Sequence, residues 1–376
     1  MSFERIGSVE AWRVRVPFLE EWLTSPEFGP AAVSADRMIL RIADGDGHEG
    51  WGEGGFDCGA EEARDALRRL TGIAAAELRL PLLDLWASRG YYHQPAPPSA
   101  YAPDAGALAH RLRHPLQSAV EMALLDLLAR RAGVPLCVLL GGPWRDRVAV
   151  DYWMGRVTPE HARRCVIRGR ALGFSGIKLK TSLEDPNVER LEAIRDAGGP
   201  GWKVTVDPNG RFHRLDDAWP TVRAMDAVGN MAILEDPFPR FHLREFAALR
   251  SRLSARVAVH VDPPESLQRV LESGAAGGLN IDSAVQGLLA WRFQAAAAAQ
   301  ANLSIWHGSG LDLGVATAAQ LHLAASAPNC RLPGDQSGPW LREATLVGDA
   351  FKAADGLVAV PSGPGLGVAV DRAALE

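Results

Sequence analysis

The chain has 376 residues, of which 47% are hydrophobic and 23% charged, the balance of an ordinary globular protein. This length accommodates two domains, or one large barrel with an appended domain. The net charge of −5 leaves no basic excess for binding nucleic acid, and no uninterrupted apolar run is long enough to span a membrane.

Four scattered cysteines indicate the compartment: Cys58, Cys137, Cys165 and Cys330. None belongs to a C-x-x-C pair or a zinc-binding spacing, and single thiols of this kind fit a reducing environment. The N-terminal sequence MSFERIGSVEAWRVRV lacks the apolar stretch of a secretion signal. We therefore expect a soluble cytoplasmic protein.

Residues 1 to about 110 have an α+β pattern. Val9–Val16 alternates like a strand, Met38–Ile42 forms a second strand, and the DGDG that follows it is a hairpin turn into a third strand, GHEGWGEGG. Glu61–Leu70 has helical spacing. This part predicts a small antiparallel sheet with a helix.

From about Pro115 the pattern changes to a long apolar helix and a short one that ends at Gly141–Gly142. Strands and helices then alternate. The predicted strands are Val148–Tyr152, Gly176–Leu179, Lys203–Val206, Ala232–Leu234, Val257–Val261, Leu279–Ile281 and Leu303–Trp306. The predicted helices are Pro159–Leu172, Pro186–Asp196, Arg214–Ala227, Leu243–Leu253, Leu267–Ser273 and Leu288–Gln300.

This alternation repeats every ~25–30 residues, the length of one βα unit, which implies a parallel sheet with right-handed crossovers. Seven or eight such units fit a closed barrel better than an open sheet. Gly356–Val360 and Gly367–Val370 resemble strands that return to the first domain. The predicted fold is α/β, a modified TIM barrel of the form (β/α)7β. The predicted boundaries are 1–115 for the α+β domain, 116–345 for the barrel and 346–376 for the returning segment.

Ionisable residues stand at the ends of six consecutive predicted barrel strands, where barrels of this kind carry their function. In order these residues are Lys180 (with Lys178 two positions earlier), Asp207, Glu235, Asp262, Asp282 and His307. Alone, an Asp after a strand is usually a helix N-cap, a Lys a solvated charge and a His a structural residue. If all of these charged side chains gather at one end of the barrel, they need a metal or a substrate to balance them.

Three of these residues, Asp207, Glu235 and Asp262, form a hard oxygen cage that suits Mg²⁺. Lys180 and His307 come from opposite sides of the ring, which places bases on two faces of a bound substrate. Asp282 can hold the imidazole in one tautomer, and the metal together with the neighbouring Lys178 can lower the pKa of Lys180.

With this set of residues the chain resembles the enolase superfamily, specifically its mandelate racemase-like subgroup, the mandelate racemase/muconate lactonizing enzyme family. The similarity covers nearly the whole chain, and the order and spacing of the motifs are more specific than any single motif. The matching stretches are ALLDLLARRAGVPLCVLLGG, GIKLK, VDPNGRF, ILEDPFP, LNIDSAVQG and HGSGLDLGVATAAQLHLAAS.

The resemblance implies roles for individual residues. Lys180 is one acid/base catalyst and Lys178 assists it beside the substrate carboxylate, while His307 with Asp282 forms the second acid/base. Asp335, in RLPGDQSG, hydrogen-bonds the enolate oxygen. The resemblance also implies one Mg²⁺ per subunit, bound by Asp207, Glu235 and Asp262.

The N-terminal domain is similar to the capping domain of this family. Its loops, around Glu20–Phe28 and Gly52–Cys58, are expected to close over the substrate. We expect the substrate-contacting residues to be Asn209, Trp22, Phe28 and Phe56. We further expect a small carboxylate as substrate and a homo-oligomer, from a dimer to an octamer.

Two positions depart from the family pattern. The third metal ligand is usually a glutamate, but here the strand reads VAVHVDPPESL. Counting from Glu235 favours Asp262, with Glu265 and His260 as alternatives. The second departure is Asp335, where the family more often has glutamate.

The shared reaction step is removal of the proton α to a carboxylate, with the enolate stabilised by Mg²⁺ and Lys178. Loss of a β-hydroxyl as water then gives a 2-keto-3-deoxy acid, and reprotonation from the opposite face gives racemisation or epimerisation. We favour dehydration of a sugar acid, with a racemase or epimerase of a 2-hydroxy acid as the alternative because the first cap loop is apolar.

A cycloisomerase or dipeptide epimerase is disfavoured, since those relatives carry a lysine where this chain has Asp282. A non-catalytic scaffold is disfavoured because no catalytic residue is missing.

Overall fold

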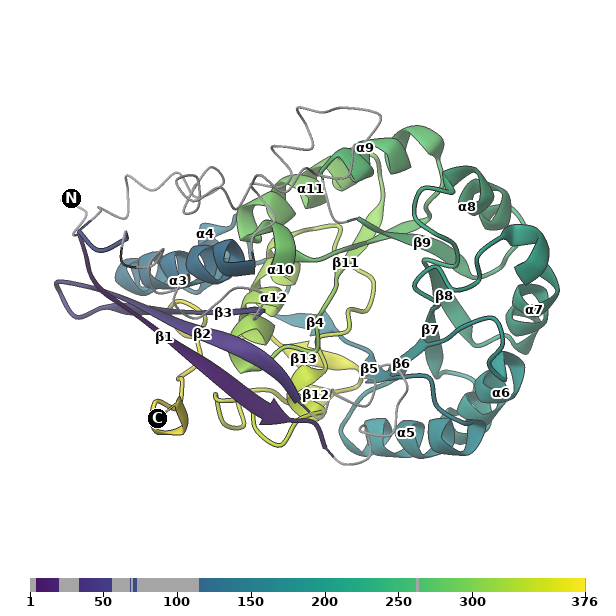
Figure 1. The fold of residues 1–376 in the computed structure, drawn as a ribbon, viewed down its shortest axis with the longest axis horizontal. Coiled ribbons are helices and arrows are strands. Elements are labelled where there is room, and N and C mark those ends of the chain that lie inside the picture. Colours follow the sequence, from purple (N-terminus) through teal and green to yellow (C-terminus); the bar gives the residue numbers. More distant parts are fainter. Residues whose placement is uncertain are drawn as a thin grey trace.

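A computed structural model describes residues 5–19, 34–55, 68, 70–72, 115–261 and 264–375. A ring of parallel strands is surrounded by helices, and a three-stranded antiparallel sheet with one long helix lies beside it (Figure 1). The α/β class predicted from the sequence is therefore confirmed. The predicted helix Glu61–Leu70 lies almost wholly outside the described residues.

The elements have the following bounds. The strands are β1 (Ile6–Pro17), β2 (Ser34–Asp44), β3 (Glu49–Gly55), β4 (Arg147–Ala149), β5 (Tyr152–Met154), β6 (Gly176–Lys180), β7 (Lys203–Asp207), β8 (Met231–Glu235), β9 (Arg256–Val261), β10 (Gly278–Ile281), β11 (Ser304–His307), β12 (Ala353–Ala354) and β13 (Leu357–Ala359). The α-helices are α3 (Pro115–Ala132), α4 (Leu136–Leu139), α5 (Pro159–Ala171), α6 (Asn187–Gly198), α7 (Leu215–Val228), α8 (Leu243–Arg250), α9 (Pro264–Ser273), α10 (Ser283–Gln286), α11 (Leu288–Gln300) and α12 (Gly314–Ser326). Short 3₁₀ helices cover Gly338–Trp340 and Ala373–Leu375.

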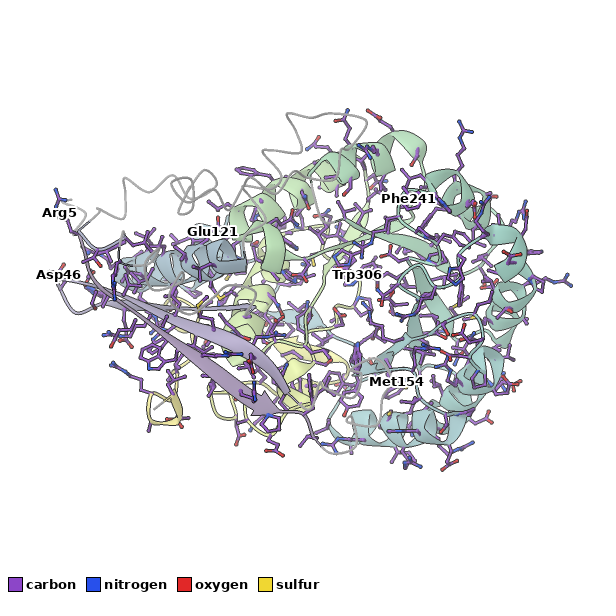
Figure 2. All side chains as sticks on the ribbon, in the orientation of Figure 1. Arg5, Asp46, Glu121, Met154, Phe241 and Trp306 are labelled. Carbon is purple, nitrogen blue, oxygen red and sulfur yellow. The ribbon has the colours of Figure 1, made fainter. Side chains whose placement is uncertain are left out.

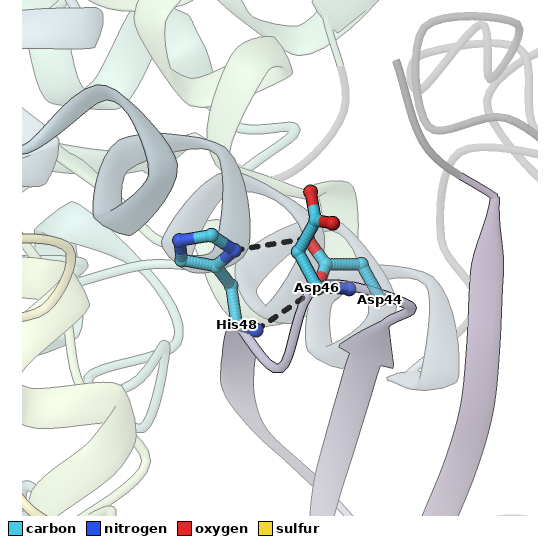
Figure 3. A group of neighbouring side chains, drawn as sticks. All are labelled: Asp44, Asp46 and His48. Carbon is cyan, nitrogen blue, oxygen red and sulfur yellow. Dashed lines mark hydrogen bonds and ion pairs between the residues drawn. The ribbon is translucent and has the colours of Figure 1, made fainter. Parts of the chain in front are cut away.

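The N-terminal sheet has the order β1-β2-β3 and is antiparallel throughout. Asp44 organises the hairpin turn between β2 and β3, because its Oδ1 accepts the backbone N–H groups of Asp46 and His48 (Figure 3). Helix α3 packs directly on β3. A Cβ at Gly52 would lie 1.9 Å from a carbonyl oxygen of α3, so this position of the GWGEGG stretch requires glycine.

The barrel sheet has seven parallel strands in the order β11-β10-β9-β8-β7-β6-β5. Isolated parallel bridges join Ile305 to Cys330 and Val150 to Gly334. The segment from Cys330 to Gly334 therefore takes the eighth position between the two edges and closes the ring. Helices α5 to α9 form an arc around the outside (Figure 1). These features match the predicted (β/α)7β barrel.

Successive side chains of each barrel strand alternate between the inside of the ring and the helix layer. Ile233, Ala258 and Trp306 form a separate apolar cluster, and Figure 2 shows Trp306 within the ring of strands. Because β11 pairs in register with β10, Asn280 lies opposite Trp306 and shares its inner face. This alternation determines which side chains reach the site.

The C-terminal tail differs from its prediction. The predicted strand Gly356–Val360 exists as β13, but it pairs with β4 at the start of the barrel and not with the N-terminal sheet. The predicted strand Gly367–Val370 is irregular chain. The tail still meets the N-terminal part: Leu366 of the tail and Trp51 of β3 both donate their N–H groups to Asp126, and Arg372 lies 3.9 Å from both Glu10 and Glu49.

The predicted first barrel strand, Val148–Tyr152, is divided into β4 and β5. Val150 donates its N–H to Gly356 of the tail, whereas Asp151 donates to Gly334 of the eighth barrel position. The chain thus changes partners between these two residues, which separates the strands. Among the described residues, no helix is both long and apolar enough to cross a membrane.

Candidate active site

Lys178 lies at the centre of a buried cluster inside the barrel. Its Nζ is 2.8 Å from Glu235 Oε2, 2.9 Å from Asp335 Oδ2 and 3.2 Å from Asp207 Oδ2. Burial alone would lower the pKa of Lys178, but Asp335, Glu235 and Asp207 outweigh it and hold that pKa well above its usual value. We call Lys178, Lys180, Asp207, Glu235 and Asp335 the lysine–carboxylate cluster.

Lys180 lies two residues further along β6, on the same face as Lys178. Its Nζ donates to Asp207 Oδ2 at 2.6 Å and to Asn209 Oδ1 at 2.8 Å. Asn209 has a left-handed backbone (φ 48°), and its N–H donates to Asp207 Oδ1. Burial would raise the pKa of Asp207, but Lys180 and Lys178 hold it below its ordinary value, so this carboxylate is ionised. Asn209, predicted to bind substrate, here contacts the predicted base.

Glu235 at the end of β8 is fully buried, and burial raises its pKa above the ordinary value. Its Oε1 accepts a hydrogen bond of 2.6 Å from Asn280 Nδ2 and lies 4.0 Å from His260 Nδ1. Asn280 was not predicted as a site residue. It stands two positions before Asp282 in LNID, and strand alternation would have identified it as inward-facing.

The structure brings together most of the predicted metal ligands. Asp207 and Glu235 are both in the cluster, and Glu235, Asp236 and His260 offer ligand atoms that all lie within 4.8 Å of one another. Buried carboxylate oxygens of this kind fit a divalent cation. The predicted third ligand, Asp262, lies outside the described residues, as do Trp22, Phe28 and Phe56. The side chain of its alternative, Glu265, is likewise not described.

The contacts of the His307 ring are with residues outside the lysine–carboxylate cluster, and its role as the second acid/base stays a prediction. The ring stacks on Trp291 of α11 at 5.3 Å between centroids. Its Nε2 is 2.9 Å from Ser283 Oγ and its Nδ1 contacts the carbonyl of Gly308. The physical reason is strand alternation: Trp306 occupies the inward position of β11, which turns the next side chain toward the helices.

Asp282 also differs from its predicted role. Its Oδ1 accepts the N–H of Ala284 and caps α10, and the hydrogen bonds of His307 go to Ser283 and Gly308 instead of this carboxylate. Asp282 has extended backbone angles (φ −112°, ψ 132°), so it continues β10 and shares the inner face with Asn280. Burial raises the pKa of Asp282, and the partly opposing influence of His307 does not cancel the effect.

Sequence reasoning missed a further buried acid, Asp151. Thr205 Oγ1 donates to its Oδ2 at 2.9 Å, and burial raises its pKa to about 7. A Cβ at Gly176 would lie 2.3 Å from Asp151 Oδ1, which explains why β6 begins with glycine. Asp151 follows the division between β4 and β5, and the sequence pattern does not mark this division.

Residues 160–374 match the family described as Enolase C-terminal domain-like. The chain is 31% identical over 341 residues to an N-succinylamino acid racemase of Thermus thermophilus, covering 88% of this chain and 86% of that protein. It is 32% identical over 281 residues to a D-gluconate dehydratase of Thermoproteus tenax, covering 69% of this chain and 55% of that protein. It is 30% identical over 269 residues to muconate cycloisomerase 1 of Rhodococcus opacus, covering 69% of this chain and 71% of that protein.

Solved structures show the same fold. The L-Ala-D/L-Glu epimerase of Bacillus subtilis superposes with a TM-score of 0.76 at 22% identity, covering 97% of this chain and 98% of that one. The chain belongs to the enolase superfamily, with relatives of the mandelate racemase/muconate lactonizing enzyme type. Its relatives are enzymes: racemases, epimerases, cycloisomerases and sugar-acid dehydratases. Enzymes of this superfamily generally use Mg²⁺.

Proposed function

We propose that this protein removes the proton α to the carboxylate of a sugar acid and then expels the β-hydroxyl as water, giving a 2-keto-3-deoxy acid. The observation that carries the proposal is the position of Lys180. Its amino group is partly exposed and lies beside a carboxylate that the buried Lys178 also contacts. A base and a fixed positive charge therefore stand together at one end of the barrel.

Each residue of the site has a separate role in the proposed reaction. Lys180 in its neutral form takes the α-proton, and Lys178 lies where its charge can stabilise the negative charge that develops on the substrate carboxylate. Mg²⁺, held by Asp207 and Glu235 with Asp262 as the proposed third ligand, would supply Lewis-acid stabilisation of the same oxygens. The protonated Lys180 can then give its proton to the departing hydroxyl, so that water leaves and the enol product tautomerises to the 2-keto acid.

Dehydration needs only one acid/base group if the removal of the α-proton and the protonation of the leaving hydroxyl occur on the same face of the substrate. The ring of His307 contacts Ser283, Gly308 and Trp291, and these contacts favour dehydration by Lys180 over racemisation by a Lys–His pair. The D-gluconate dehydratase among the relatives agrees with this assignment.

A second candidate is a racemase or epimerase in which Asp282 serves the opposite face. Lys180 ends the second strand of the eight-membered ring and Asp282 follows the sixth, so the two lie across the ring from each other. Asp282 faces inward by strand alternation, and its raised pKa suits a carboxyl group that donates a proton. The N-succinylamino acid racemase among the relatives agrees with this alternative.

One screen separates the two. The purified protein with Mg²⁺ is incubated in D₂O with a library of sugar acids and 2-hydroxy acids, and NMR follows 2-keto acid formation and α-deuterium exchange. Keto acid formation that is lost in Lys180→Met supports the dehydratase. Exchange with inversion and without keto acid identifies the racemase. Neither signal from any acid would contradict both.

A further inference from the structure

His260 stands inside the barrel beside the carboxylates of the cluster. It pairs in register with Asn280, so both side chains share the inner face of the sheet. Asn280 Nδ2 donates to Glu235 Oε1 at 2.6 Å, and His260 Nδ1 lies 4.0 Å from that same oxygen. The imidazole is largely buried, with 17% of its side chain exposed. An aromatic nitrogen therefore lies within the oxygen-lined site.

Asp236 holds this part of β9 in position. Its Oδ1 accepts the backbone N–H of His260 at 2.9 Å, and its Oδ2 accepts from Arg240 Nε at 2.7 Å. Both of its oxygens are thus engaged by protein donors. Of the three residues whose ligand atoms lie within 4.8 Å of one another, Glu235 and His260 are the ones that aim at the cluster. Asp236 positions the backbone of His260, and its carboxylate belongs to the same group of ligand atoms.

We propose that His260 gives a ring nitrogen to the metal ion held by Asp207 and Glu235, and that this nitrogen shifts the selectivity of the site from Mg²⁺ toward Mn²⁺. Mg²⁺ prefers an all-oxygen octahedral shell, whereas imidazole is a ligand suited to first-row transition metals. The inference rests on the proposed function in that it needs the metal site of that function, but it does not depend on which acid is the substrate.

Pulsed EPR with Mn²⁺ as the probe tests the coordination directly. Mn²⁺ bound to the full-length protein should show ¹⁴N modulation from a coordinated histidine. The modulation should disappear in His260→Gln and persist in His213→Gln, a matched change at an exposed histidine after β7. Bound Mn²⁺ without ¹⁴N modulation in the unchanged protein would overturn the inference and leave the proposed function standing, and no bound Mn²⁺ would overturn both.

Calorimetric titration tests the selectivity. Loss of one nitrogen ligand should weaken Mn²⁺ binding by about tenfold or more and Mg²⁺ binding much less, so the ratio of the two affinities should fall in His260→Gln and not in His213→Gln. An unchanged ratio in His260→Gln would overturn the inference. The absence of ¹⁴N modulation in the unchanged protein would overturn the inference without the variant, so that outcome stays decisive if His260→Gln folds poorly.

Discussion

Trp306 and His307 are consecutive residues of β11 with side chains on opposite faces of the barrel sheet. Trp306 packs with Ile233 and Ala258 inside the ring, whereas His307 stacks on Trp291 in the helix layer. Burial lowers the pKa of His307, and the neighbouring Asp282 only partly offsets this effect. The imidazole is therefore neutral, and its geometry fits a structural residue between β11 and α11.

The first prediction separates His307 from Asp282. In the racemase alternative, Asp282→Asn should lose α-deuterium exchange for one α-configuration, whereas in the dehydratase it should keep exchange. In both cases the variant should keep its stability, because asparagine is an equally good N-cap for α10. His307→Asn should keep exchange and lose about 1–3 kcal/mol of unfolding free energy, since its stacking and its hydrogen bond to Ser283 disappear. NMR in D₂O and urea unfolding measure the two effects. A stable His307→Asn variant without exchange would restore the His307 base.

The second prediction concerns the metal. Asp207→Asn and Glu235→Gln should each abolish Mg²⁺ binding in calorimetric titration while the circular dichroism spectrum is retained. Lys178 keeps two of its three carboxylate partners in either variant, so the buried ammonium is not left uncompensated. Glu272→Gln, an exposed change on α9, is the control. Unchanged Mg²⁺ affinity in either site variant would remove that residue from the metal site.

The third prediction separates the two lysines. Lys180→Met should slow α-deuterium exchange by about a hundredfold or more, as expected for loss of a general base, with little loss of stability because Lys180 is partly exposed. Lys178→Met leaves Asp207, Glu235 and Asp335 buried without their shared cation, which should cost several kcal/mol of unfolding free energy, on the order of 3–5. Equal stability losses in urea unfolding of the two variants would contradict this division.

The ends of β6, β7 and β8 could be predicted from the sequence because each of these strands is a short apolar run that stops at a charged residue. GIKLK, KVTVD and MAILE all begin and end within about one residue of the expected positions, and their inward charges meet in the lysine–carboxylate cluster. The hairpin at Asp44 follows in the same way from a local turn signal. Local patterns of this kind depend only on neighbours in the sequence.

The errors come from relationships that are not local. The last residue of each strand was considered without asking whether its side chain points into or out of the ring. His307 was therefore expected to point inward. Asn280, which pairs with Trp306 one position before His307, was overlooked. The pairing of β13 with β4 joins segments about two hundred residues apart in the sequence, and a short apolar run does not specify its partner. Asp262, Trp22, Phe28 and Phe56 lie outside the described residues and stay predictions.

The last prediction concerns Glu121, a buried carboxyl group of α3 that joins this helix to the barrel. Its Oε2 accepts the N–H of Leu288 at 2.6 Å and its Oε1 accepts that of Leu289 at 3.2 Å, both in the first turn of α11. Burial raises the pKa of Glu121 from 4.5 to about 7, against the opposing effect of these two donors. Between these values the folded protein retains a proton that the unfolded chain releases.

The unfolding free energy should therefore decrease as pH rises through this window, by up to about 1.4 kcal/mol per pH unit from this group. Glu121→Gln has no proton to lose, so the stability difference between the unchanged protein and the variant isolates the effect from all other titrating groups. Urea unfolding of both proteins at pH 5, 6 and 7 should show the advantage of the unchanged protein shrinking as pH rises. An advantage that grows with pH would mean that the N-terminus of α11 keeps Glu121 ionised in the folded state, with a pKa below that of the unfolded chain.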